Sequence, residues 1–84
     1  MLEKYRNKID EIDDEFTKLF NERFKIIEEI IKYKKENNLP ILDSNREKEI
    51  LNNNLNKIDL KYQKYFKEVY LKLLEESKKF QKEV

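Results

Sequence analysis

Four polar residues lie where the helical pattern of the chain otherwise places hydrophobic ones: Arg23, Lys34, Ser77 and Gln81. Arg23 and Lys34 are separated by about three helical turns, so on one helix they share a face and stand roughly 16 Å apart. Ser77 and Gln81 have the i, i+4 spacing that stacks side chains on one face of a helix. Two cations and two neutral hydrogen-bonding groups on inward faces suit a small anionic ligand better than they suit a protein core.

Each of these residues also has a purely structural explanation. Arg23 at a coiled-coil seam position sets register or pairs with a carboxylate. Lys34 near a helix end extends its ammonium group to water and complements the helix dipole. Ser77 and Gln81 bond each other or a backbone carbonyl. Such explanations suffice for any one polar residue, but four together favour a binding site.

A second group of candidates lies near the start of a short predicted helix. Asp43 and Glu47 are one turn apart on one face of that helix. Glu47 also completes a capping box that begins at Ser44. This capping role is the structural explanation of Glu47, as an alternative to a role in a binding site. Arg46 lies in the first turn, where the helix dipole disfavours a cation, so we expect it to form a salt bridge or to contact an anion.

Arg6 borders the predicted seam near the start of the chain. It precedes Arg23 by 17 residues, which is about 25 Å along a helix axis. Arg6 therefore cannot serve the pocket of Arg23 within one chain, although it can reach that of a partner arranged antiparallel to it. Its structural alternative is an exposed ion pair with Asp10.

A long helix over residues 2 to 36 is predicted to position Arg6, Arg23 and Lys34. A heptad repeat of apolar residues runs through this segment, interrupted only by Arg23. The two series are Leu2, Ile9, Phe16, Arg23, Ile30 and Tyr5, Ile12, Leu19, Ile26, Tyr33. Such a helix would be roughly 50 Å long, whereas a compact monomer of this size has a radius of gyration of only about 12 Å. The seam therefore predicts a homodimer.

Two further helices complete an all-α fold with one long, one short and one medium helix. Asn37 to Pro40 should end the first helix. The capping box from Ser44 to Glu47 should open the second helix, which fades in the asparagine-rich stretch from residue 52. Asp59 is the predicted N-cap of a third helix over residues 60 to 83, which carries Ser77 and Gln81. The chain reads as one domain, residues 1–84.

Composition excludes several other classes of function. The chain contains no Cys and no His, which removes disulfides, thiolate chemistry and the usual general base and zinc ligand. The net charge of +1 gives nucleic-acid binding little support. No apolar run reaches membrane-spanning length. Asp10, Asp13 and Asp14 lack the spacing of a calcium loop. We expect a soluble cytoplasmic protein with no metal or other cofactor.

Four segments together resemble the all-helical, AroQ-type chorismate mutases. They are LEKYRNKIDEID (2 to 13), LFNERFKIIEEIIKYK (19 to 34), LPILDSNREKEIL (39 to 51) and EESKKFQ (75 to 81). The most specific features are the R-x16-R-x10-K spacing, the D-x-x-R-E opening of the second helix and the S-x-x-x-Q near the end. The resemblance covers nearly the whole chain. It implies an intertwined homodimer that rearranges chorismate to prephenate on the route to phenylalanine and tyrosine.

The resemblance also implies a role for each candidate residue. Arg23 would bind one substrate carboxylate and Arg6, from the other subunit, the second. Lys34 and Gln81 would donate to the ether oxygen whose bond to carbon breaks. Glu47 would accept from the substrate hydroxyl, with Asp43 beside it, while Arg46 and Ser77 would line the site.

The residue set suits this reaction because a Claisen rearrangement moves no proton. It requires a substrate held in its reactive conformer and negative charge stabilised on the departing oxygen. Two alternatives stay open. An isochorismate-pyruvate lyase would use the same scaffold, and a noncatalytic helical dimerisation module would need only the seam.

Overall fold

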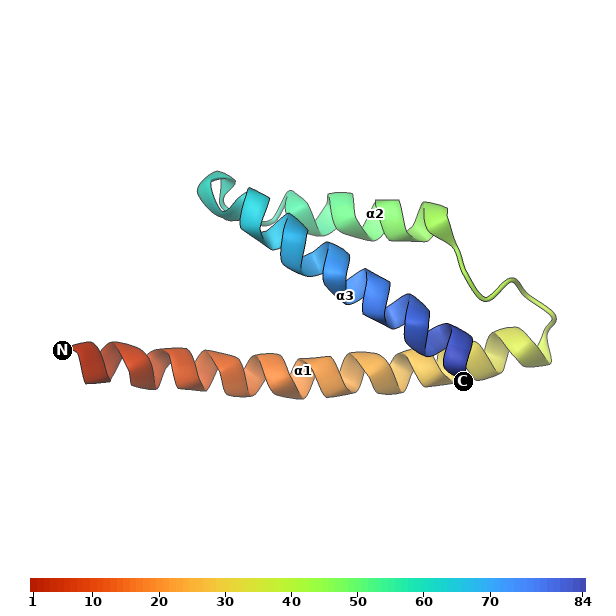
Figure 1. Ribbon diagram of the computed structural model, residues 1–84, viewed down its shortest axis with the longest axis horizontal. Coiled ribbons are helices and arrows are strands. Elements are labelled where there is room, and N and C mark those ends of the chain that lie inside the picture. Colours follow the sequence, from red (N-terminus) through yellow and green to blue (C-terminus); the bar gives the residue numbers. More distant parts are fainter.

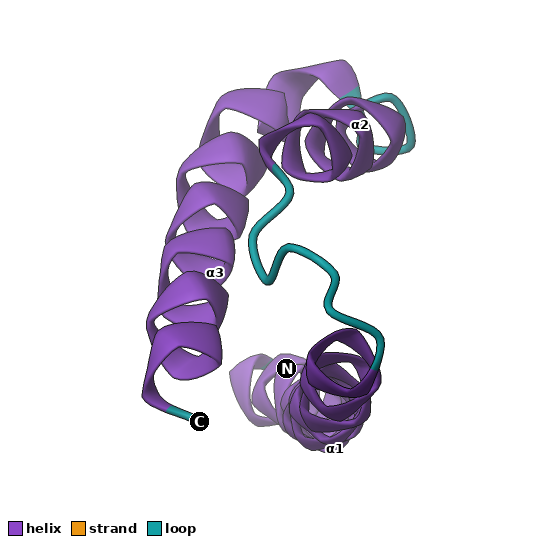
Figure 2. Cartoon of the chain, turned by 90° about the vertical axis from the view of Figure 1, so that its right-hand side faces the viewer, coloured by secondary structure: helices purple, strands orange, loops and turns teal.

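The computed structural model describes residues 1–84 as three helices with no strand. Helix α1 spans Leu2–Glu36, α2 spans Ser44–Leu55 and α3 spans Gln63–Glu83, with a short 3-10 turn, η1, at Leu60–Tyr62. In Figure 1 α3 runs diagonally between α2 and the C-terminal half of α1. In Figure 2, α2 lies above α1, and both α3 and the loop that joins α1 to α2 run between them. The predicted all-α fold of one long, one short and one medium helix is confirmed.

Helix α1 begins and ends where the sequence predicts. It is 35 residues long, and the molecule extends 55 × 24 × 17 Å. Asn38 takes the left-handed conformation with φ 56°, which asparagine tolerates better than most residues. Leu39 N–H then donates to Lys34 C=O at 2.8 Å and Asn38 N–H to Lys35 C=O at 3.4 Å. These two bonds form a Schellman motif, which satisfies the last carbonyls of the helix before Pro40.

The start of α2 corrects the predicted capping box. Asp43, not Ser44, is the N-cap, because its side-chain oxygen accepts a hydrogen bond from Arg46 N–H at 3.1 Å. Ser44 is already the first helical residue. Glu47 does not fold back onto the helix start, since its carboxylate pairs instead with Lys78 of α3. Aspartate is as good an N-cap as serine, so a shift of one residue costs the helix nothing.

The turn between α2 and α3 is braced by two amide side chains. Gln63 Nε2 donates to the carbonyls of Leu55 and Ile58 at 3.2 and 3.0 Å. Asn54 Nδ2 donates to the Tyr70 hydroxyl at 3.0 Å. These bonds hold the end of α2 against α3 and let the helix continue through its asparagines to Leu55.

Asp59 corrects a second capping prediction. It precedes the 3-10 turn η1 rather than α3, and its side chain makes no capping hydrogen bond. Only its backbone carbonyl takes part, by accepting from Tyr62 N–H at 2.8 Å. The regular α-helix therefore starts at Gln63, three residues later than the sequence predicts.

The core of the single chain is small and lies between α1 and α3. Only Ile27, Ile31, Leu74 and Ser77 are buried. Phe24 packs on Phe80 across the two helices with ring centroids 5.2 Å apart. The radius of gyration is 15.8 Å, against about 12 Å for a compact chain of this length. The core therefore supports only the C-terminal half of α1.

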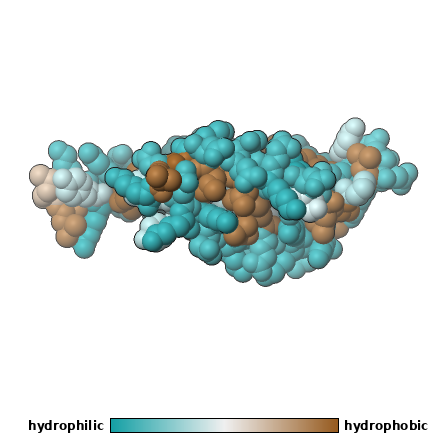
Figure 3. All heavy atoms as spheres, turned by 90° about the horizontal axis from the view of Figure 1, so that it is seen from above, coloured by the Kyte–Doolittle hydropathy of each residue, from teal (hydrophilic) through white to brown (hydrophobic).

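The N-terminal half of α1 has no cover in the single chain. Leu2, Ile12 and Phe16 are 61%, 62% and 61% exposed, and Figure 3 shows brown apolar atoms open to solvent at the N-terminal end, at the left. Tyr62 of η1 and Val69 of α3 are also exposed. Monomeric proteins rarely leave so long an apolar stripe in water. None of the three α-helices contains an apolar stretch of the length that spans a lipid bilayer.

Candidate active site

An open groove of about 600 Å³ lies between the three helices, beside the only core of the chain. Its volume is in the range of small-molecule sites. Seven of the eight predicted site residues line it: Arg23, Lys34, Asp43, Arg46, Glu47, Ser77 and Gln81. Residues from α1, from the start of α2 and from the end of α3 therefore meet in one groove, with apolar walls that include Ile27, Ile30 and Leu74.

Arg23 is held by a chain of hydrogen bonds across the groove. Its Nη1 donates to Ser77 Oγ at 2.7 Å, and that hydroxyl donates to Leu73 C=O at 2.8 Å. Ser77 is only 3% exposed, so the hydroxyl is fixed as both donor and acceptor. We expected carboxylates to compensate Arg23 in the seam, but Arg23 forms no ion pair. A buried hydroxyl is its partner, and the rest of the guanidinium donors are free for a ligand.

Lys34 and Gln81 are both half-buried in the groove wall. The Lys34 ammonium donates to Ile41 C=O at 2.9 Å, which ties α1 to the loop before α2. An ammonium has three donors, so two remain. Gln81 makes no side-chain hydrogen bond within the chain, and its amide is therefore available to a ligand.

Asp43, Arg46 and Glu47 form the α2 side of the groove. Asp43 caps the helix, as described above. Arg46 Nη1 pairs with Glu49 at 2.9 Å on the exposed face, so the salt bridge that its position suggested is present. Glu47 is half-buried, and its Oε2 lies 3.0 Å from Lys78 Nζ.

Arg6 is the one predicted site residue that the chain does not bring to the groove. It is exposed on the free N-terminal half of α1 and is absent from the groove lining. The ion pair with Asp10 that would explain it structurally does not form. This placement agrees with the expectation that Arg6 cannot reach the groove of its own chain.

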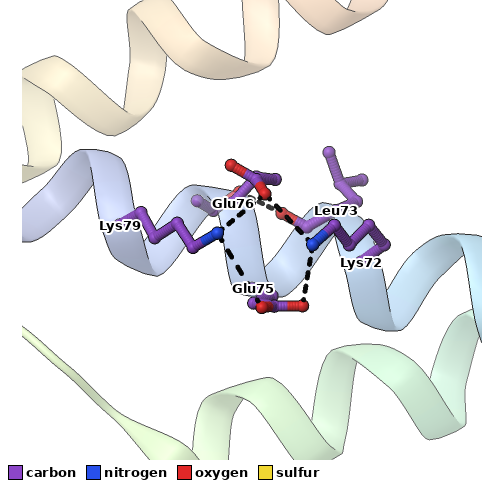
Figure 4. Close-up of polar contacts among 6 residues, drawn as sticks. Lys72, Leu73, Glu75, Glu76 and Lys79 are labelled. Carbon is purple, nitrogen blue, oxygen red and sulfur yellow. Dashed lines mark hydrogen bonds and ion pairs between the residues drawn. The ribbon is translucent and has the colours of Figure 1, made fainter.

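The outer face of α3 carries a separate charge ladder, which Figure 4 shows for Lys72, Glu75, Glu76 and Lys79. Lys72 lies 3.3 Å from both glutamates, and Lys79 lies 3.1 Å from Glu76. Hydrogen bonds to Glu75 and Glu76 raise the pKa of Lys72, and bonds from Lys79 and Lys72 lower the pKa of Glu76. These charges satisfy one another at the surface and take no part in the groove.

Sequence patterns alone missed four contributors to the site. Glu22 and Tyr70 line the groove, but their spacing resembles that of ordinary surface and core residues. The Ile41 carbonyl holds Lys34, yet a backbone group carries no sequence signal. Lys78 lies 31 residues from Glu47, and only the packing of α3 on α2 makes them neighbours.

The charged side chains around the groove are balanced in number, so the groove of one chain has no net charge. Three cations, Arg23, Lys34 and Arg46, face three carboxylates, Glu22, Asp43 and Glu47. No group of three His, Cys, Asp or Glu residues is placed to hold a metal ion. What the groove offers is a set of hydrogen-bond donors, a type of group suited to an anionic ligand.

The groove of this all-α domain has the size and the partly polar lining of a small-molecule site. Comparison with known protein families matches residues 5–82 to chorismate mutase type II. The chain therefore belongs to this family, and its activity is that of a chorismate mutase, an intramolecular isomerase of aromatic amino acid biosynthesis. No curated protein and no solved structure matches the chain.

Proposed function

We propose that the groove binds chorismate and drives its Claisen rearrangement to prephenate by conformational clamping and electrostatic stabilisation, without covalent or proton-transfer catalysis. Arg23 binds one carboxylate, assisted by Ser77. Lys34 and Gln81 donate to the ether oxygen as its bond to carbon breaks. Glu47 accepts from the ring hydroxyl, with Asp43 and Arg46 beside it.

The single observation that carries this proposal is the convergence of the free donors. The guanidinium of Arg23, the ammonium of Lys34 and the amide of Gln81 all line one groove, and each keeps donors that no protein group uses. A noncatalytic dimerisation module has no need for three unsatisfied donors beside its core. The transition state of the rearrangement needs such donors, because negative charge builds on the departing oxygen.

A homodimer completes the proposed site. The exposed seam of α1 begins at Leu2 and runs directly into the groove, where Leu19 and Ile26 form part of the wall. A second copy packed antiparallel along this seam buries the uncovered N-terminal half and brings its Arg6 to the groove. Arg6 of the partner subunit then binds the second substrate carboxylate. We assign the enzyme to the cytoplasm, which fractionation of the native cells would test.

The function is tested by adding purified protein to chorismate and identifying the product. Prephenate alone is the expected product. Release of pyruvate from isochorismate, with no turnover of chorismate, would instead make the protein a lyase on the same scaffold. No turnover of either compound by a folded helical dimer would leave an interaction module as the better explanation.

The pH profile tests the role of Gln81. A neutral amide donates a hydrogen bond at any ordinary pH, whereas a carboxyl group in its place would have to be protonated first. We therefore expect turnover to vary little between pH 6 and 8, roughly within a factor of two. Conversely, Gln81→Glu should create a profile that rises toward acid. A wild-type profile with a steep rise below pH 6 would contradict the assignment of Gln81 as donor.

A further inference from the structure

One ion pair joins two helices of the chain, and it reaches the candidate active site. The other ion pairs lie between residues three or four apart on a single helix. Lys78 of α3 and Glu47 of α2 are the exception, with Nζ and Oε2 3.0 Å apart. Lys78 does not line the groove. It acts on the site only through Glu47.

Glu47 stands in the wall between two hollows. It lines the groove on one side and, on the other, a smaller hollow of about 150 Å³ that is also lined by Lys78, Leu51 and Leu74. Lys78 binds Oε2, and no protein group bonds to Oε1. The carboxylate thus has one oxygen occupied by a cation and the other free to accept a hydrogen bond. Its side chain is 23% exposed, so the ion pair is partly shielded from water.

We propose that Lys78 is a positioning residue, which orients the Glu47 carboxylate toward the substrate hydroxyl and offsets its negative charge. This inference rests on the proposed function, in which Glu47 is the hydroxyl acceptor. Without Lys78 the carboxylate is free to rotate on α2 and to take its hydrogen bonds from water.

The charge of Lys78 matters because the substrate is a dianion. The groove lining of one chain carries as many carboxylates as cations, so it has no net positive charge of its own. Glu47 is the half-buried carboxylate whose only partner is a side chain outside the groove, whereas Asp43 accepts from a backbone N–H. A cation behind Glu47 reduces its repulsion of the two incoming carboxylates. Both effects of Lys78, orientation and charge offset, operate through Glu47.

The test is the kinetics of Lys78→Met with a matched control on the same helix. In the proposed site Glu47 contacts the hydroxyl in the substrate and in the transition state alike. A misplaced Glu47 carboxylate therefore weakens the binding of both equally, and the effect appears in KM. We expect Lys78→Met to raise KM about tenfold while kcat changes less than about threefold. Lys78→Arg, which keeps the charge, should recover most of the loss. Lys79→Met makes the same change of charge within the surface ladder and should leave KM unchanged.

A double-mutant cycle separates positioning from a structural role. In a Glu47→Gln background there is no carboxylate to orient or offset, so adding Lys78→Met should change KM by less than about twofold. A KM for Lys78→Met equal to that of Lys79→Met would overturn the proposal. So would the full tenfold effect persisting in Glu47→Gln, or a loss of thermal stability with unchanged KM. Failure of the wild-type protein to convert chorismate would refute the proposed function itself.

Discussion

Arg23→Ala is expected to lose roughly a thousandfold or more in kcat/KM for chorismate. The side chain is half-buried, and it is aimed at the groove by Ser77, itself fixed by Leu73 C=O. Removal takes away the only α1 guanidinium in the groove and with it one of the two proposed carboxylate clamps. The loss should be measured as initial rates of chorismate consumption over a range of substrate concentrations.

The fold should survive this change. Arg23 forms no ion pair, and the Ser77 hydroxyl keeps Leu73 C=O as its partner when the guanidinium is gone. Replacing Arg23 by an apolar residue should not weaken the proposed dimer, because a polar residue at a seam position costs stability. Helicity and dimer mass, measured beside the kinetics, therefore serve as controls. Arg23→Lys retains the charge without the planar fork and should recover only part of the activity. Near-normal activity of Arg23→Ala would show that Arg23 is not needed for substrate binding and would favour a structural role in setting the register of the seam.

Lys34→Ala is expected to lower kcat about 10²- to 10³-fold while changing KM much less. In the proposed complex, the ammonium faces an oxygen that is a neutral ether in the substrate and gains negative charge as the bond breaks. The contact therefore strengthens in the transition state, and its loss falls on kcat. Steady-state kinetics, with prephenate confirmed as the product, would measure the effects on kcat and on KM separately.

Lys32→Ala is the control for Lys34→Ala. Lys32 is exposed on α1, two residues from Lys34 and outside the groove. Its substitution by Ala therefore removes the same charge without changing the groove lining. It should behave as wild type. Lys34 also ties the loop before α2 through Ile41 C=O, so its removal is expected to loosen Asp43 and raise KM modestly. A variant whose kcat stays normal while KM rises sharply would make Lys34 a loop anchor rather than a donor to the ether oxygen.

Much of the site was predictable because helix geometry converts spacing into position. The gap between Arg23 and Lys34 fixes their shared face, and the i, i+4 spacing of Ser77 and Gln81 does the same on α3. The end of α1 was predictable for an equally local reason. Asn38 accepts the left-handed conformation that closes a Schellman motif, and Pro40 prevents the helix from continuing.

What the sequence could not provide depends on contacts between helices. Ser44 and Glu47 satisfy the capping-box pattern, yet Asp43 caps the helix and Glu47 turns to Lys78. Rules based on neighbouring residues cannot tell whether Glu47 bonds the start of its own helix or a lysine on another helix. The same holds for Arg23, whose partner proved to be a buried hydroxyl and not a carboxylate.

A chain without His or Cys can still supply the catalysis that this mechanism needs. An acceleration of about a millionfold corresponds to roughly 8 kcal/mol. One preorganised donor aimed at developing charge contributes about 3 to 4 kcal/mol. In the proposed mechanism, Lys34 and Gln81 at the ether oxygen would supply most of it, and the clamping of the two carboxylates into the reactive conformer would supply the rest.

The most direct test of the proposed shared site is a mixture of two inactive variants. In an antiparallel dimer, the Arg6→Ala subunit lacks the arginine that would bind substrate in its partner's groove. The Arg23→Ala subunit lacks the arginine in its own groove. A heterodimer of the two contains one groove with both arginines intact. After unfolding and refolding together at equal amounts, the mixture should regain about a quarter of wild-type activity, because half of the dimers are mixed and each has one intact site. A mixture that forms heterodimers yet stays inactive would contradict the account.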